Sequence, residues 1–118
     1  MTGVLTIHGF TGSPATLTPV TDALAAAGFD VSAPCLPGHG TRIEDMLGVT
    51  FADWLDAAES AYEELAARTA PVVLFGQSMG AVLTAMLAAR HDVAGAVFVN
   101  PATAPLDGTP TSGGSRRR

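Results

Sequence analysis

One short segment, residues 72–90, constrains the fold of this chain more than any other. The apolar residues 72–75 predict a buried strand, and residues 81–90 predict a helix. Between them lies the turn Gly76-Gln77-Ser78-Met79-Gly80. So tight a passage from strand to helix forces the central serine into a strained backbone conformation and lifts its hydroxyl above the sheet. Side chains two residues before and after the serine would collide with the neighbouring strand and helix, which explains the two glycines.

A second motif lies near the start of the chain. Residues 4–7 predict a short apolar strand, and His8-Gly9-Phe10-Thr11-Gly12 follows it directly. Both motifs therefore stand at the carboxyl end of a predicted strand, which is where open α/β sheets bind their ligands. Taken alone, the turn around Ser78 would also fit an ordinary Gly-Ser turn before a helix. The second motif favours the interpretation of Ser78 as a nucleophile.

Five segments together resemble the carboxylesterase and monoacylglycerol-lipase-like branch of the α/β-hydrolase superfamily of serine hydrolases. They are His8-Gly9-Phe10-Thr11-Gly12, Leu36-Pro37-Gly38-His39-Gly40, the helix start at Asp53-Trp54, Gly76-Gln77-Ser78-Met79-Gly80, and the strand that ends at Val99-Asn100-Pro101. The resemblance runs from about residue 4 to residue 101 and corresponds to the N-terminal half of such enzymes only.

The resemblance implies a serine hydrolase of carboxylic esters that forms an acyl-enzyme on Ser78. In this family one oxyanion donor is the backbone N–H after the nucleophile, here Met79, and the other comes from the loop after an earlier strand, here Phe10. The remaining implied site residues shape or support the loop and the elbow: His8, Gly9, His39, Gly76, Gln77 and Gly80. The expected substrate is a small, neutral or apolar acyl ester. Neither a cofactor nor a metal ion is expected.

The order of predicted elements indicates an α/β fold, an open and mostly parallel sheet with helices on both faces in three layers. A helix that begins at Ser13-Pro14 and ends before Gly28 leads to a strand over residues 29–33. A second helix begins at Thr50 with Asp53 in a capping box, and a last strand covers residues 93–99. Residues 1–103 are expected to form the N-terminal part of an α/β-hydrolase core domain. Residues 104–118 read as a low-complexity, disordered tail.

The acid and the base of a catalytic triad are the missing pieces. In this fold they follow the serine in the order acid, then histidine, and the chain offers only His91, Asp92 and Asp107 after Ser78. A helix of about 12 residues at 1.5 Å per residue puts His91 and Asp92 about 18 Å from Ser78. Asp107 has no histidine beyond it. We therefore expect no triad acid or base within this chain.

These omissions predict a chain that is truncated after the strand following the nucleophile helix. The strand over residues 94–99 then becomes an exposed apolar edge, and self-association through it is expected. The alternative function is accordingly a catalytically inactive remnant or an interaction module. Thioesterase, peptidase and acyltransferase activities use the same elbow, and the fold does not separate them.

Composition excludes several classes of partner. The chain carries 11 acidic residues against 6 arginines, for a formal charge of −5, so no basic face predicts nucleic-acid binding. Cys35 is the only cysteine, which excludes an internal disulfide. We see neither a signal peptide at the N-terminus nor an apolar run long enough to span a membrane. A cytoplasmic location is expected.

Overall fold

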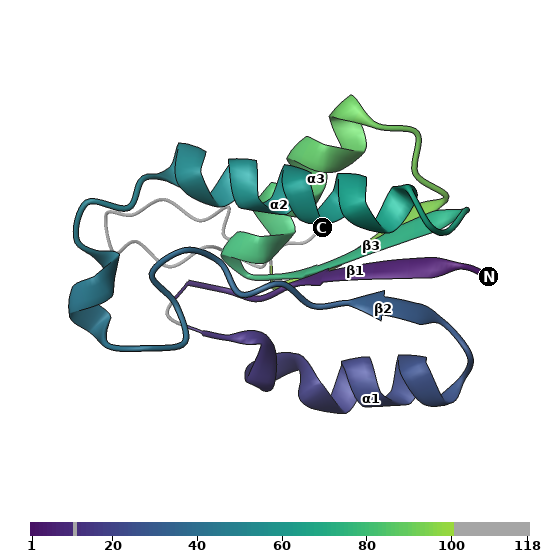
Figure 1. Cartoon of the computed structure of the whole chain (residues 1–118), viewed down its shortest axis with the longest axis horizontal. Coiled ribbons are helices and arrows are strands. Elements are labelled where there is room, and N and C mark those ends of the chain that lie inside the picture. The colour runs from purple at the N-terminus through teal and green to yellow at the C-terminus, as the bar shows by residue number, and fades with distance from the viewer. Residues whose placement is uncertain (11, 101–118) are drawn as a thin grey trace, which may run out of the picture.

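The computed structural model describes residues 1–10 and 12–100, which form a parallel four-stranded sheet. The strands are β1 (Gly3–Ile7), β2 (Asp30–Ser32), β3 (Val72–Gln77) and β4 (Gly95–Val99), in the spatial order β2-β1-β3-β4. Every neighbouring pair is parallel. Because β1 and β3 are the central pair, the loops that follow them lie side by side at one end of the sheet (Figure 1).

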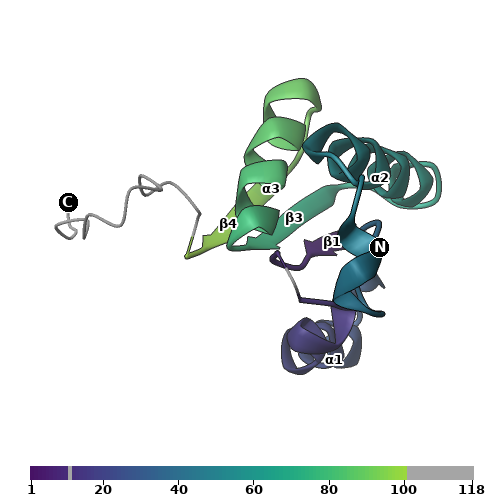
Figure 2. The ribbon, with the colours of Figure 1, turned by 90° about the vertical axis from the view of Figure 1, so that its left-hand side faces the viewer.

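Helices cover both faces of this sheet. The helix α1 (Thr18–Ala26) lies on one face, whereas α2 (Phe51–Ala66) and α3 (Met79–Arg90) lie on the other (Figures 1 and 2). Two short 3₁₀ helices, η1 (Pro14–Leu17) and η2 (Ile43–Met46), complete the elements. The three layers confirm the predicted α/β architecture. No helix of the described residues combines the length and the apolarity that a membrane crossing requires.

The core lies between the sheet and the α2–α3 layer. Leucines from every one of these elements are fully or almost fully buried there: Leu5, Leu55, Leu65, Leu74, Leu83 and Leu87. Along β3 burial alternates, with Val72, Leu74 and Gly76 buried and the intervening residues only half-buried. Because side chains alternate between the two faces of a strand, the α1 face of β3 is the less completely covered one.

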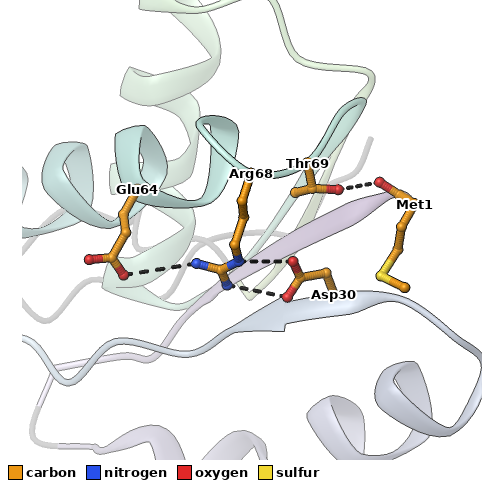
Figure 3. Close-up of polar contacts among 5 residues, drawn as sticks. All are labelled: Met1, Asp30, Glu64, Arg68 and Thr69. Carbon is orange, nitrogen blue, oxygen red and sulfur yellow. Dashed lines mark hydrogen bonds and ion pairs between the residues drawn. The ribbon is translucent and has the colours of Figure 1, made fainter.

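Polar contacts tie the segment after α2 to β2 and to the start of the chain (Figure 3). The Arg68 guanidinium donates from Nε to Asp30 Oδ2 at 2.9 Å and from Nη2 to Asp30 Oδ1 at 3.2 Å. These hydrogen bonds hold the pKa of Asp30 below its ordinary value. Next to Arg68, the Thr69 hydroxyl donates to the carbonyl oxygen of Met1. The N-terminal strand is thereby anchored to the segment that leads into β3.

The predicted start of α2 is confirmed, whereas the predicted start of α1 is not. The capping box of α2 is present, since Thr50 N–H donates to Asp53 Oδ2 at 2.9 Å and Asp53 N–H to Thr50 Oγ1 at 3.2 Å. The helix predicted from Ser13-Pro14 instead begins as η1, without a side-chain cap from Ser13, and becomes α-helical only at Thr18. Pro19 explains the break, because proline has no N–H to bond a carbonyl one turn earlier and favours the first turn of a helix. The predicted strand 29–33 is also shorter, as β2.

Candidate active site

Ser78 occupies the junction between β3 and α3 in a left-handed backbone conformation, with φ 57° and ψ −120°. Its N–H donates to the Val99 carbonyl at 2.8 Å, and its own carbonyl accepts from Ala81 N–H at 2.9 Å. The side chain makes no capping hydrogen bond to the helix that follows. The main chain of Ser78 is therefore fixed on both sides, while its hydroxyl is not engaged in holding α3.

The two flanking glycines fit where no other residue would. A Cβ at Gly76 would overlap Thr84 Oγ1 and the carbonyl oxygen of Gly80, and a Cβ at Gly80 would overlap the carbonyl oxygen of Ile7. Since Ile7 is the last residue of β1, α3 begins in direct contact with the end of the neighbouring strand. The elbow and the loop after β1 are thus packed backbone against backbone.

The loop after β1 lies against the serine itself. A Cβ at Gly9 would stand 3.0 Å from Ser78 Cβ and 3.6 Å from Ser78 Oγ, so a side chain at this position would crowd the hydroxyl. The next residue, Phe10, leaves 55% of its surface exposed. The structure thus brings together at the ends of β1 and β3 the residues that the sequence singled out from both motifs.

An open cavity of about 360 Å³ lies over Ser78. Its lining consists of Gly9, Phe10, Gly12, Thr16, Gln77 and Ser78, none of which carries a charge. Gly12 belongs to the motif after β1 but was not named among the site residues, and sequence reasoning missed Thr16. Thr16 lies in η1, the first turn after this loop, where its hydroxyl donates to the Ser13 carbonyl at 2.7 Å.

His8 is fully buried and both of its ring nitrogens are engaged. Leu36 N–H donates to Nε2 at 3.0 Å, so the proton is on Nδ1, which donates to the Gly9 carbonyl at 2.9 Å. Burial lowers the pKa of His8 from its ordinary value of 6.5, and the neighbouring His39 lowers it further, against the raising effect of the Gly9 carbonyl. His8 is therefore a neutral, fixed support of the loop rather than a base for Ser78.

His39 belongs to an aromatic cluster beside the cavity. Its ring centroid lies 5.9 Å from that of Phe10 and 5.5 Å from that of Trp54, and Phe10 and Trp54 are 5.7 Å apart. The Pro37 carbonyl accepts from both Trp54 Nε1 at 2.9 Å and His39 Nδ1 at 3.1 Å. The cluster fixes the side chain of Phe10 on the side of the cavity toward α2.

His91 is engaged elsewhere, at the far end of α3. Its Nε2 lies 2.8 Å from Glu59 Oε2, Arg90 Nη1 donates to Glu59 Oε1 at 3.2 Å, and the His91 ring stacks on Tyr62 at 4.2 Å. Partial burial raises the pKa of Glu59, but the hydrogen bonds from His91 and Arg90 outweigh it and leave the pKa below the ordinary value. His91 thus ties α3 to α2. Asp107 lies outside the described residues.

The three histidines of the chain are thereby accounted for, and the structure does not bring a carboxylate–histidine pair to Ser78 among residues 1–10 and 12–100. Over the same residues there is no group of three or more histidine, cysteine, aspartate or glutamate side chains placed to hold a metal ion.

Comparisons with known proteins cover most of the chain. A family model described as "Alpha/beta hydrolase family" matches residues 4–118. A thermostable monoacylglycerol lipase from Bacillus sp. (strain H-257) is 46% identical over 101 residues, which are 85% of this chain and 40% of that protein.

Solved structures agree with this match. A structure of the metagenome-derived lipolytic enzymes LipS and LipT superimposes with a TM-score of 0.83 at 37% identity, over 86% of this chain and 42% of that one. A pyrethroid hydrolase from Sphingobium faniae JZ-2 gives a TM-score of 0.68 at 28% identity, over 85% of this chain and 40% of that one. The chain spans about two-fifths of the length of these relatives.

Proposed function

The chain belongs to the alpha/beta hydrolase family, and from that premise we propose that it acts on carboxylic esters through an acyl-enzyme on Ser78. One observation carries the proposal: Ser78 stands at φ 57° at the end of β3, with its hydroxyl unused by α3 and beside an uncharged cavity of about 360 Å³. In this fold, acyl transfer uses a serine in a strained turn whose hydroxyl faces a cavity for the ester.

The reaction proceeds in two steps. Ser78 Oγ attacks the ester carbonyl carbon and the carbonyl oxygen becomes an oxyanion. The serine proton passes to a base that residues 1–10 and 12–100 do not supply, because their histidines are engaged elsewhere. Collapse of this tetrahedral intermediate breaks the bond to the alcohol, which leaves with a proton, and the acyl group remains on Oγ. A water molecule then attacks the acyl-enzyme in the same way and releases the carboxylic acid together with the free serine.

The oxyanion would be held by the N–H groups of Met79 and Phe10. Met79 opens α3, and the first N–H groups of a helix have no partner within it and carry the positive end of its dipole. Phe10 follows Gly9, whose backbone lies against Ser78. Donors fixed in advance need no reorganisation as charge develops, and losing one of them costs about 3 kcal/mol of transition-state stabilisation.

The substrate class proposed is a neutral acyl ester. The lining of the cavity has no charged side chain that would select an acidic or basic substrate, and Phe10 offers an apolar wall. The names of two relatives, a monoacylglycerol lipase and lipolytic enzymes, support an ester with an aliphatic acyl group.

A second candidate function is an inactive member of the family that acts as an interaction module. The observation that favours it is the engagement of the histidines, because His8 Nε2 is occupied by Leu36 N–H and His91 is held by Glu59. Without an acid–base pair, the oxyanion hole and substrate binding alone retain about 10³-fold acceleration over water.

Hydrolysis of a short p-nitrophenyl ester by the purified 118-residue chain tests both candidates. Ser78→Ala is the test variant and Ser60→Ala, an exposed position on α2, is the matched control. The first candidate predicts turnover that is lost in Ser78→Ala and kept in Ser60→Ala. Equal rates in all three proteins would contradict it and leave the interaction module.

A further inference from the structure

The cavity over Ser78 has two chemically different sides. Phe10 is the one large apolar side chain among the described residues that line it, whereas Thr16 and Gln77 bring a hydroxyl and an amide. Thr16 lies in η1, the turn that leads into α1. Gln77 ends β3 two residues after Phe75, which lines the groove on the α1 face, and alternate residues of a strand share a face. The polar side of the cavity is therefore the one toward α1.

Phe10 forms the apolar side, toward α2. Its ring meets the ring of Trp54 at a centroid distance of 5.7 Å and an angle of 63°, and that of His39 at 5.9 Å and 78°. Such edge-to-face arrangements are the preferred geometry of aromatic pairs. The Pro37 carbonyl accepts hydrogen bonds from both Trp54 and His39, so the two rings that support Phe10 are themselves fixed.

We propose that the aliphatic acyl chain of the ester lies against Phe10 and that its alcohol lies on the side of Thr16 and Gln77. Trp54 and His39 are then positioning residues, which act on the substrate only through the Phe10 ring. An apolar chain that covers Phe10 removes apolar surface from water. The same chain laid over the amide and the hydroxyl would take polar groups out of water without a hydrogen bond in return. This inference rests on the proposed ester hydrolysis.

The second step of the reaction favours the same assignment. Once the alcohol has left, the acyl group stays on Ser78 and a water molecule takes the place of the alcohol. Hydrogen bonds hold such a water molecule. The Thr16 hydroxyl donates to the Ser13 carbonyl and keeps acceptor capacity, and the Gln77 amide has both donors and an acceptor. Phe10 offers no such group, so its side suits the part of the ester that stays.

Two isomeric esters distinguish the acyl side from the alcohol side. Ethyl octanoate carries its long chain on the acyl group, and octyl acetate carries it on the alcohol. We expect Phe10→Ala to lower the ratio of their kcat/KM values, ethyl octanoate over octyl acetate, about tenfold, as lost contact with about two methylene groups would. Because both esters use the same serine and the same oxyanion donors, a general loss of activity leaves this ratio unchanged.

Phe29→Ala is the matched control for Phe10→Ala. Phe29 is also a partly exposed phenylalanine, but it lines the groove on the α1 face and not the cavity over Ser78. This variant should leave the ratio of the two esters as it is. An unchanged or increased ratio in Phe10→Ala, or an equal fall in both variants, would overturn the proposal.

The positioning role of Trp54 has its own test in the same ratio. Trp54→Ala should lower the ratio, whereas Trp54→Phe should keep it, because the smaller ring retains the contact with Phe10. The double variant Phe10→Ala/Trp54→Ala should match Phe10→Ala alone, since Trp54 acts through the ring already removed. A merely structural role would slow both esters alike, and additive losses in the double variant would contradict the coupling.

Binding is measurable without turnover, because Trp54 is the only tryptophan of the chain. Octyl methyl ketone resembles the ester but cannot be hydrolysed. Its chain should alter the emission of Trp54 by covering Phe10, 5.7 Å away, and Phe10→Ala should weaken the binding about tenfold. Equal binding to both proteins would overturn the assignment of the acyl side even if esters are hydrolysed. Binding that depends on Phe10 in a chain without ester turnover would overturn the hydrolysis and support the apolar side.

Discussion

The main-chain N–H of Leu36 donates a hydrogen bond to Nε2 of His8 across 3.0 Å of the buried interior. This contact joins the loop after β2 to the loop after β1 and leaves His8 only the acceptor role at that nitrogen. Protonation of Nε2 would destroy the bond and place a charge in the core. His8, the histidine of the motif after β1, is consequently a structural one.

Acidification should therefore destabilise the chain between neutral and mildly acidic pH. The pKa of His8 is lowered on folding from 6.5, so the unfolded chain binds a proton more readily. The stabilising contribution is complete above pH 6.5 and is lost as the pH falls toward the folded pKa. Urea unfolding followed between pH 8 and 5 measures it, and His8→Asn should show a flatter profile. Identical slopes in the two proteins would contradict the assignment.

Glu59→Gln should destabilise the contact between α2 and α3 by about 1–3 kcal/mol at pH 7, because it leaves His91 and Arg90 without their carboxylate. The pKa of Glu59 is lowered on folding, so this contribution is complete above pH 4.5 and is lost as the pH falls through the folded pKa. The difference in unfolding free energy between the two proteins should accordingly shrink in acid. Glu63→Gln, on an exposed part of α2, serves as control.

Gly80→Ala should destabilise the fold by about 3 kcal/mol or more, because its Cβ has no room against the Ile7 carbonyl oxygen and either β1 or α3 must shift. Gly95→Ala provides the matched control, since a Cβ there meets nothing within 4 Å and should change stability by no more than about 1 kcal/mol. Thermal unfolding at low protein concentration compares them. Equal losses would show that the elbow is not closed by backbone contact.

Trp54→Phe should cost about 1 kcal/mol of stability, the usual net value of one hydrogen bond, because the Pro37 carbonyl keeps only the bond from His39. The ring edge contact with Phe10 survives in this variant, whereas Trp54→Ala removes it. Any ester turnover should therefore fall more in Trp54→Ala than in Trp54→Phe. A larger loss of turnover in Trp54→Phe would mean that the indole N–H matters beyond support.

The local and periodic features of the fold were predictable from sequence. The strand–turn–helix around Ser78, the α/β architecture and the capping box at Thr50 all follow from residues close in the chain, and the structure has each of them. The family resemblance is confirmed by the match over residues 4–118. The roles given to Ser78, Phe10 and Met79 remain predictions.

What escaped prediction depends on contacts between distant segments. The tautomer of His8 is decided by Leu36, 28 residues away. The Pro37 carbonyl, shared by His39 and Trp54, joins the loop after β2 to helix α2, and no periodicity connects these segments. The late start of α1 also escaped prediction. Pro14 stands in the first turn of η1 and Pro19 in the first turn of α1, and each position suits proline only at a helix start.

The register of the central strands has a consequence for how the chain folds. Gly3 of β1 lies opposite Val72 of β3, so the middle of the sheet closes a loop of about seventy residues, and contacts of such long range slow folding. The pairing of β1 with β2 spans a much shorter loop. During synthesis β1, α1 and β2 are available well before β3 emerges. The cavity over Ser78 is lined by residues that follow β1 and by the end of β3 with the serine after it, and it is therefore completed late in folding.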